Sequence, residues 1–390
     1  MNLAFYYHIP VHVENGKIKT PGYLGVFIDS LALEVDTLYL VMHQASITRI
    51  PECDYVLTQQ NIVWVNIGIA KPAWHRTFFP ASTLKGKLNE IKNCDAFLVR
   101  SPSPLSPFFK KYAPYTRIFF LIVGDYMAGS ARYKNGTWRD KIIFLYLNYF
   151  NKKYINQIRQ TDCLVNSESL LESYKPIAKS ISFVRTTTLT STDYYKREDT
   201  CINPQKINIL YTGRIEPSKG LHDMLKALSI LNKKHNNIFY FHIVGWESDG
   251  TKPHEQFLKK EAQTLECETH LIFHGKKTLG EELNTMYRHS DIYVLSSHHE
   301  GFPRTIWEAM ANSLPVVATK VGGIPTTLTH LQNAYLIEPQ KIEEIVTAIE
   351  KIASDTEFRK SLITNAYELA KENHITTQTK KLILQIQEKL

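Results

Sequence analysis

The chain has 390 residues, of which 43% are hydrophobic and 22% are charged, an ordinary balance for a globular protein with large cores. This length favours two domains, and the composition excludes a disordered or fibrous chain. Basic side chains outnumber acidic ones by 46 to 38, and the resulting net charge of +8 favours an anionic partner such as a nucleic acid, a membrane surface or a phosphate.

The first half of the sequence alternates short apolar runs with helical patterns. Continuous apolar strands separated by helices predict a parallel sheet covered on both faces. The expected helices include residues 24–33 and 140–159. The expected strands are residues 3–7, 38–42, 62–65, 96–99, 118–123 and 163–165.

A polar stretch at residues 190–205 reads as a linker, after which the alternating pattern restarts. We therefore expect one domain at residues 1–195 and a second at residues 206–375, with a closing helix at about 376–390 that packs back onto the first. The strands expected in the second half are residues 207–211, 239–244, 271–273, 292–295, 316–318 and 335–337.

This alternation predicts an α/β fold with two Rossmann-like, doubly wound parallel-sheet domains that face a cleft. Ligands of such sheets bind beyond the carboxyl ends of the strands. Five cysteines, an odd number without a C-x-x-C pair, favour a reducing compartment. No apolar run approaches the roughly 20 residues needed to cross a bilayer. We expect a cytoplasmic protein, with peripheral contact at the inner face of the cytoplasmic membrane as a second expectation.

The excess positive charge belongs to the first half of the chain. Residues 1–200 hold 24 basic and 16 acidic side chains, whereas residues 201–390 hold 22 of each. Ten of the cations lie within residues 100–153, where only Asp125 and Asp140 oppose them. This asymmetry indicates two domains with different functions.

The first motif follows the strand that is expected to end at Tyr211. Gly213 makes a turn, and a helix is expected to start near Gly220, so Arg214 and Lys219 would be held above the strand ends. Two fixed cations beside a helix N-terminus suit a diphosphate. The alternative is a solvated loop whose basic residues bind nothing.

The second motif, residues 298–310, follows the strand expected at 292–295. Pro303 suits the first turn of a helix, so neighbouring amides can face an anion. Glu300 before this helix and Glu308 in its second turn would supply hydroxyl acceptors on both sides of a phosphate, as a nucleotide sugar requires. The alternative is an ordinary helix start with a solvated Glu308.

Together these segments resemble the retaining family 4, or group 1, glycosyltransferases of the two-Rossmann (GT-B) fold. Glu300 and Glu308 match that family's paired glutamates with seven residues between them. Further matches, in sequence order, are Gly213-Arg214 with Lys219-Gly220, Val244-Gly245, Phe273-His274-Gly275 and Val321-Gly322-Gly323-Ile324-Pro325. In the first half, the resemblance rests on the glycine loop at Gly22 and the strand that ends at Asn166-Ser167.

The resemblance implies a role for each matching residue. Arg214 and Lys219 would stabilise the leaving diphosphate, Glu300 would hold the hydroxyls of the transferred sugar, and Glu308 would hold the ribose. The donor, a UDP- or GDP-sugar, would also be contacted at Gly213, Gly245, His274, Gly301, Phe302, Pro303 and Thr305.

The resemblance also implies a mechanism and an acceptor side. Transfer would retain the anomeric configuration and would need neither a metal nor another cofactor. The chain has no Asp-x-Asp, and its histidines, including His298-His299, show no ligand spacing. On the acceptor side, Gly22 and Asp125 are candidates. Gly124 replaces the histidine that often precedes this aspartate, and a strand-end turn is the alternative role for Asp125.

We therefore expect an enzyme that moves a sugar to a glycan or lipid-linked acceptor, with bacterial cell-surface polysaccharide such as O-antigen, capsule or exopolysaccharide as the pathway. The alternatives are a non-catalytic nucleotide-sugar-binding subunit and a nucleotide-sugar epimerase of similar fold.

The basic stretch of the first half also contains many aromatic residues, which is typical of a helix at an anionic membrane surface. Residues 133–154 contain five Lys or Arg, aromatic residues that include Trp138, Phe144, Tyr146, Tyr149 and Phe150, and the apolar residues Ile142, Ile143, Leu145 and Leu147. The alternative is that the apolar residues pack in the core. No nucleic-acid-binding module is present in the sequence, so we do not expect a nucleic-acid partner.

Overall fold

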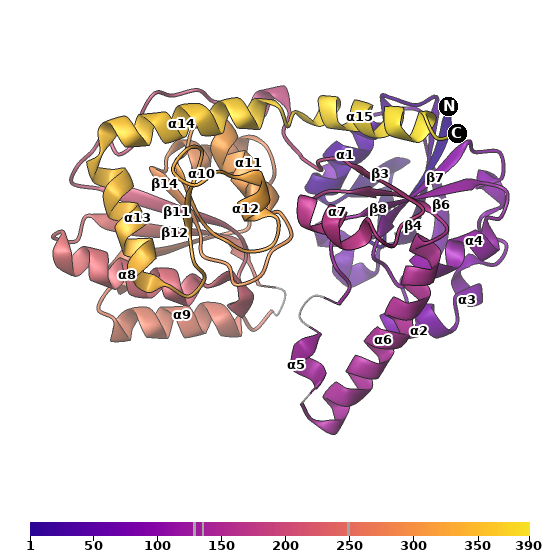
Figure 1. The fold of residues 1–390 in the computed structure, drawn as a ribbon, viewed down its shortest axis with the longest axis horizontal. Helices are drawn as coiled ribbons and strands as arrows, with labels where there is room; N and C mark the ends of the chain where they lie inside the picture. The colour runs from indigo at the N-terminus through magenta and orange to yellow at the C-terminus, as the bar shows by residue number, and fades with distance from the viewer. Residues whose placement is uncertain (128–129, 135, 248–249) are drawn as a thin grey trace. The chain divides into compact units, whose positions relative to one another are not determined.

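The computed structural model describes residues 1–127, 130–134, 136–247 and 250–390, with the side chains of residues 131 and 132 outside this description. The chain forms two compact units. Unit 1 comprises Met1–Thr186 and Ile375–Leu390, and unit 2 comprises Thr187–His374. Each unit is an α/β domain with helices on both faces of a parallel sheet (Figure 1), which confirms the predicted class of two Rossmann-like domains.

The main sheet of unit 1 has seven parallel strands in the order β10-β9-β8-β7-β1-β4-β6. The strands are β1 (Asn2–Tyr6), β4 (Thr37–Gln44), β6 (Ile62–Ile69), β7 (Ala96–Ser101), β8 (Arg117–Ile122), β9 (Asp162–Val165) and β10 (Ser180–Phe183). A small antiparallel sheet joins β2 (His12–Glu14), β3 (Lys17–Thr20) and β5 (Tyr55–Val56).

Period-2 alternation along β1 explains why helices cover both faces of this sheet. Leu3 and Phe5 are buried in one hydrophobic cluster, to which α1 and α15 contribute, whereas Ala4 and Tyr6 belong to the cluster on the other face, with α4 and α6. The helices are α1 (Gly22–Ala32), α2 (Ala73–Phe78), α3 (Ala81–Leu84), α4 (Phe109–Tyr112), α5 (Ala131–Lys134), α6 (Trp138–Ile158), α7 (Glu168–Tyr174) and α15 (Ile375–Gln387).

Unit 2 has six parallel strands in the order β13-β12-β11-β14-β15-β16. The strands are β11 (Ile207–Arg214), β12 (Phe239–Trp246), β13 (Leu271–Gly275), β14 (Ile292–Leu295), β15 (Val316–Thr319) and β16 (Tyr335–Ile337). The helices are α8 (Leu221–Lys234), α9 (Pro253–Thr264), α10 (Glu281–Arg288), α11 (Arg304–Ala311), α12 (Ile324–Thr327), α13 (Ile342–Ser354) and α14 (Thr356–Lys371).

The polar stretch expected as a linker packs against unit 2. Asp193 accepts a hydrogen bond from the amide of Asn284 at 2.7 Å, and the guanidinium of Arg197 donates to the carbonyl oxygen atoms of Arg288 and Ser290. These polar side chains form hydrogen bonds within unit 2 rather than with water. The boundary between the units therefore lies near Thr187 and not within residues 195–206, where the sequence predicted it.

No helix within the described residues is both long enough and apolar enough to cross a membrane.

Candidate functional site

The residues of both sequence motifs lie at the point in unit 2 where the order of the strands reverses, between β11 and β14. β11 and β14 are hydrogen-bonded neighbours, but β12 lies on the other side of β11, and β15 lies on the other side of β14. The loops that follow β11 and β14 therefore diverge at a topological switch point, where doubly wound sheets bind their ligands. The first of these loops carries Lys219 and the second carries Glu300.

Lys219 and Glu300 form an ion pair, with 2.7 Å between Nζ and Oε1. Their side chains are only 13% and 11% exposed, so the attraction is screened less than at the surface. The hydroxyl of Ser297 donates a second hydrogen bond to the same Oε1, also at 2.7 Å. The charge of each residue is thus balanced by the other, and both are held at the switch point.

Glu308 lies on α11 and is buried. Its Oε2 accepts a hydrogen bond from the hydroxyl of Tyr287 at 2.8 Å, and its Oε1 accepts one from Thr188 at 3.3 Å. Burial, with the Glu308 charge as the next cause, holds the pKa of Tyr287 well above its ordinary value, so this tyrosine remains a donor. A ribose at Glu308 would compete with Thr188 and Tyr287 for the carboxylate.

Arg214, at the end of β11, is the more exposed of the two predicted cations. Its side chain is 55% exposed and lies 3.2 Å from Glu216, so this exposed pair contributes little to stability and leaves the guanidinium accessible to a ligand.

The start of α11 has no side-chain cap. Pro303 is the residue before the helix, which begins at Arg304, and does not lie in its first turn as predicted. The hydroxyl of Thr305 accepts a hydrogen bond from Tyr293 at 2.7 Å, and Phe302 stacks on Trp307 with ring centroids 4.8 Å apart. Helix amides without a side-chain acceptor suit an anion.

Two glycines allow the loops of the site to approach each other. Gly220 has a φ of 61°, and a Cβ there would lie 2.1 Å from the carbonyl oxygen of Ser296. Gly322, with a φ of 56°, would place a Cβ 2.0 Å from the carbonyl oxygen of Glu300. Both positions require the left-handed backbone and the missing side chain, so the glycines help to place Lys219 and Glu300.

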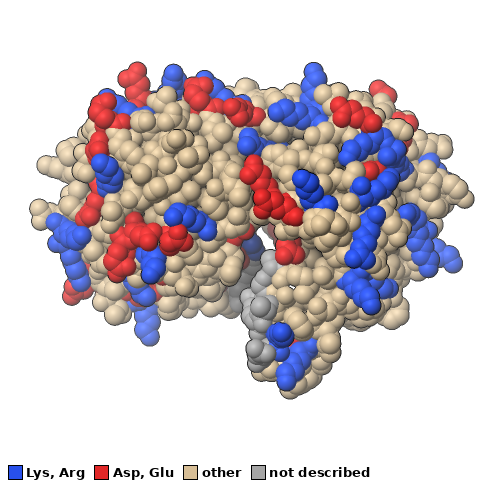
Figure 2. Space-filling model, viewed as in Figure 1, with Lys and Arg blue, Asp and Glu red and all other residues tan. Residues whose placement is uncertain are grey.

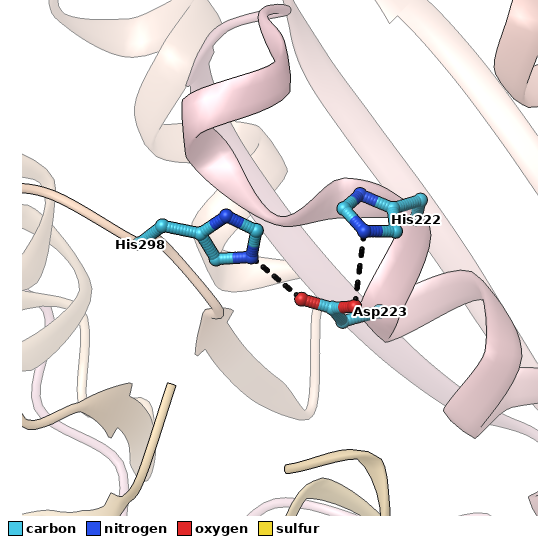
Figure 3. Close-up of side chains that lie close together, drawn as sticks. All are labelled: His222, Asp223 and His298. Atoms are coloured by element: carbon cyan, nitrogen blue, oxygen red, sulfur yellow. Dashed lines mark hydrogen bonds and ion pairs between the residues drawn. The ribbon is translucent and has the colours of Figure 1, made fainter. Parts of the chain in front are cut away.

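A histidine and aspartate cluster ties the start of α8 to the loop after β14 (Figure 3). Asp223 is buried and accepts a hydrogen bond from His298 at 2.7 Å, and its Oδ1 lies 3.1 Å from Nε2 of His222. The nearest ligand atoms of the three residues lie within 4.8 Å of one another, and two imidazoles with one carboxylate are donors that Zn²⁺ prefers. The sequence missed this group because its members come from segments 75 residues apart.

His274, expected to contact the donor, instead continues a chain of polar side chains within the sheet. His242 donates from Nε2 to the Asn208 side-chain oxygen at 3.1 Å, so its Nδ1 accepts from His274 Nε2 at 2.9 Å. Burial, followed by the charges of His274 and Lys206, lowers the pKa of His242 to about 4.

Gly245 and Gly213 face each other on β12 and β11, and a Cβ on Gly245 would lie 1.8 Å from the Gly213 oxygen.

The two candidate acceptor residues lie in unit 1 and already have partners. Asp125 is exposed after β8 and accepts a hydrogen bond from the amide of Met127 at 2.9 Å, which is the strand-end turn considered above. Gly22 is the first residue of α1 rather than part of a loop, and its amide donates to Asp54 at 2.8 Å.

Sequence reasoning missed the residues that support the site rather than the motif residues themselves. No role was predicted for Thr188, Tyr287 or Ser297. No local sequence motif marks these hydroxyl groups, because their hydrogen-bond partners lie on other elements of the fold.

Comparison with known proteins now identifies the second half of the chain. Residues 195–369 match the sequence profile of the glycosyl transferases group 1 family. This part of the chain is similar to a group 1 glycosyltransferase domain. The match covers Lys219, Glu300 and Glu308, and it confirms the predicted group 1 resemblance, whereas membership of family 4 stays a prediction.

Two curated relatives and one solved structure illustrate the likeness. The capsular polysaccharide biosynthesis glycosyltransferase CapM of Staphylococcus aureus is 26% identical over 152 residues, 39% of this chain and 38% of CapM. Protein CapJ of the same species is 23% identical over 286 residues, 73% of this chain and 68% of CapJ. HepE of Anabaena, solved in complex with UDP, has a TM-score of 0.73, 14% identity and full coverage of both chains. The chain thus spans about two fifths of the length of relatives such as CapM, and HepE shows that its fold is that of GT-B glycosyltransferases.

Proposed function

We propose that the protein transfers a sugar from a nucleotide-diphosphate sugar, a UDP- or GDP-sugar, to a glycan or lipid-linked acceptor. The observation that carries this proposal is the Lys219–Glu300 pair at the switch point of a domain similar to group 1 glycosyltransferases. HepE, which shares the fold, was solved with UDP-glucose, which supports a nucleotide-sugar donor.

The site chemistry follows from the charge that develops on the leaving group. When the bond from sugar to phosphate breaks, negative charge builds on the diphosphate, and preorganised cations in a low-dielectric site lower this barrier. Lys219 and Arg214 would supply these cations. A phosphate that draws Lys219 toward it would release Glu300 to accept hydrogen bonds from the sugar hydroxyls, while Glu308 would bind the ribose.

Retention of the anomeric configuration is part of the proposal. The acceptor would attack from the face that the diphosphate leaves, and the leaving phosphate would help to remove the acceptor proton. NMR of the product would give the anomeric configuration, and an inverted product would contradict this mechanism.

The proposed reaction needs no metal ion, because Lys219 and Arg214 take the role of neutralising the diphosphate. Turnover should therefore be unchanged by EDTA. A loss of turnover that Mg²⁺ or Zn²⁺ restores would overturn this part of the proposal.

Donor hydrolysis without acceptor tests the activity even before the acceptor is identified. Release of UDP or GDP from their sugars should fall by about 100-fold or more in Glu300→Ala and Lys219→Ala. Lys233→Ala, an exposed change on α8, is the matched control and should retain activity. Near-normal release in both site variants would overturn the assignment, and an isomerised sugar without transfer would indicate an epimerase. Donor binding with no turnover across lipid-linked acceptors would indicate a binding subunit.

The acceptor-side proposal includes contact with an anionic membrane through the first half of α6. In this helix Phe150, Tyr154 and Ile158 are buried, but Trp138 and Leu145 are each 68% exposed, so the alternative that the early apolar residues pack in the core is wrong. This half of α6 extends beyond the sheet of unit 1 (Figure 1). Exposed apolar side chains beside lysines suit the interface of an anionic bilayer.

The ten cations of residues 100–153 do not form one patch. Arg117 pairs with Asp162 at 3.1 Å, Arg100 lies over the ring of Tyr7, and the side chain of Arg132 is outside the described residues. Figure 2 shows that Lys and Arg outnumber Asp and Glu on the visible face of unit 1, whereas both kinds are mixed on that of unit 2. The proposed membrane contact is therefore restricted to α6 and its neighbours.

Vesicle sedimentation tests the membrane contact. The protein should sediment with vesicles containing phosphatidylglycerol, less at high salt because the charges are screened, and little with phosphatidylcholine alone. Leu145→Asp should reduce sedimentation several-fold, whereas Ile202→Asp, at another exposed residue, should not. Equal sedimentation of both variants would contradict the role of α6.

We further propose a bacterial cell-surface polysaccharide pathway, with O-antigen, capsule and exopolysaccharide as the candidate products. The capsular polysaccharide function named for CapM supports this proposal.

A further inference from the structure

A second polar region lies in unit 1, at the carboxyl ends of its central strands, and it contains a buried cation. Arg76 on α2 is only 9% exposed. Its Nη1 lies 3.4 Å from Nε2 of His43, and its Nε is buried without a hydrogen-bond partner. Among the residues that the structure describes, no carboxylate pairs with Arg76.

The hydrogen bonds of His43 show that its imidazole is neutral, so it does not compensate the positive charge of Arg76. Its Nδ1 lies 3.0 Å from the carbonyl oxygen of Gly68, which can only accept, so Nδ1 carries the proton. Nε2 then accepts from Arg76, and His43 is neutral. Burial lowers the pKa of His43 to about 4, with the Arg76 charge as a further cause.

More cations surround the same region. Burial lowers the pKa of His8, which follows β1, to about 4, and the charges of Arg76, Arg100 and Arg49 lower it further. The Nδ1 of His8 and the Nε of Arg100 are also buried without partners. Within the described part of the chain, Arg49 is the one cation of this group with a carboxylate beside it, that of Glu52 at 2.7 Å.

Arg49 and Arg76 line a cavity of about 350 Å³, within the range of small-molecule sites. The cavity, here called the Arg76 pocket, lies beyond the carboxyl ends of β1, β4 and β6. It is lined by Pro10, Gln44, Ser46, Arg49, Ile69, Ala70, Lys71, Pro72, Ala73 and Arg76. Its charged lining residues are all basic.

An unpaired buried guanidinium is unfavourable by several kcal/mol unless a counter-charge is present. A bound oxyanion would provide that charge and pair with the guanidinium of Arg76 and with Lys71, which both line the pocket.

We propose that the Arg76 pocket binds an oxyanion, a phosphate or a carboxylate, carried by the acceptor. The inference that the pocket binds an oxyanion depends only on the residues of unit 1. That this oxyanion belongs to the acceptor rests on the proposed function. The acceptor would then be an anionic glycan or glycolipid rather than a neutral sugar, with its charged group held by Arg76 and Lys71.

Titration of inorganic phosphate by calorimetry at low ionic strength tests the pocket. The Lys219→Ala background removes one of the two cations proposed to bind phosphate in unit 2. Any binding left at Arg214 is common to all variants in this background, so a difference between them reports on unit 1. We expect Arg76→Met in this background to weaken phosphate affinity at least tenfold, and Lys71→Gln, a change at an exposed residue that does not threaten folding, to weaken it several-fold. Lys87→Gln, at an exposed lysine of unit 1, is the charge-matched control. Equal phosphate affinity in all these variants, or no binding in Lys219→Ala itself, would overturn the proposal.

Melting in buffer without multivalent anions separates a ligand-binding arginine from a structural one. Arg76→Met should melt at the same temperature as the wild type or higher, because it removes an uncompensated buried charge. A lower melting temperature with unchanged response to phosphate would assign Arg76 a structural role instead.

Competition experiments separate the possible sources of the oxyanion. Displacement of phosphate by glucuronate would indicate an acidic sugar, and displacement by a sugar phosphate or by vesicles of phosphatidic acid would indicate a phosphorylated glycan or a lipid phosphate. Donor binding and donor hydrolysis should be unchanged in Arg76→Met. Loss of all donor chemistry in the wild type would therefore contradict the proposed function without affecting the pocket.

Discussion

At the scale of single residues, the candidate site is held together by contacts between the same groups that are proposed to bind the donor. Lys219 and Glu300 neutralise each other, and Glu308 is occupied by Tyr287 and Thr188. Each contact keeps a polar group satisfied in a partly buried site, where an unsatisfied charge would be costly. A donor would exchange these partners for its own phosphates and hydroxyls.

The Lys219–Glu300 contact can be measured by a double-mutant cycle of unfolding free energies. Lys219→Met and Glu300→Gln each leave a partly buried partner without its counter-charge, so the pair should show a coupling of about 1–3 kcal/mol. Urea denaturation of the wild type, the two single variants and the double variant gives this value. Strictly additive effects would mean that the two side chains do not interact in solution.

Gly322 offers a test of backbone approach. In Gly322→Ala the new Cβ would meet the carbonyl oxygen of Glu300, so the loop must shift. We expect a stability loss of about 1–3 kcal/mol and a donor affinity reduced about tenfold. Gly86→Ala has a similar φ of 74° with nothing within 4 Å of the added atom, so it should have the strain without the effect on donor binding. Titration of UDP or GDP into both variants makes the comparison, and equal affinities would contradict the role of Gly322.

At the scale of elements, the positions of most strands could be predicted because buried parallel strands are continuous apolar runs. β14 and β16 have the predicted bounds, whereas β11 continues through Gly213 to Arg214 because Gly213 and Gly245 allow close pairing with β12. The small sheet of unit 1 and β10 were missed, since their short, half-polar segments have no such signal. Of the site, the motif residues were predictable, but their hydroxyl partners and the cluster around Asp223 depend on tertiary contacts.

The connection between α8 and the loop after β14 leads to another prediction. His298→Ala removes the hydrogen bond to Asp223 that joins these two segments, and should lower donor affinity several-fold by loosening the loop that carries Glu300. The neighbouring His299 is exposed, so His299→Ala is the matched control. Calorimetry with the preferred nucleotide measures both. A larger effect of His299→Ala would contradict the role of the cluster.

At the scale of the whole molecule, the positive charge is distributed unequally between the two halves of the chain. The excess of cations belongs to the first half of the sequence, where it surrounds the Arg76 pocket and lies along α6. The second half has no net charge, and its proposed diphosphate site depends on two cations, Arg214 and Lys219. Fold class was predictable from the alternation of elements, but the units' boundary near Thr187 was not, because the polar residues after it resemble a linker.

The buried histidines predict how global stability depends on pH. His8, His43 and His242 each have a pKa lowered from the ordinary 6.5 to about 4, so between these values the unfolded chain binds protons that the folded chain does not. Their contribution is fully present above about pH 6.5 and is lost as the pH falls toward 4. Urea denaturation should therefore give a lower stability at pH 5 than at pH 7. His43→Asn should reduce this difference, and a stability independent of pH in this range would contradict the burial of the neutral imidazoles.

The most direct test of a nucleotide-sugar site in unit 2 is a thermal-shift screen against UDP, GDP, ADP and their sugars. A ligand that binds only the folded protein raises the melting temperature in proportion to occupancy. We predict that UDP or GDP and its sugar raise it in the wild type and in Lys233→Ala, and that the shift is lost in Lys219→Ala. No shift with any of these nucleotides, or the same shift in Lys219→Ala, would contradict the proposed site.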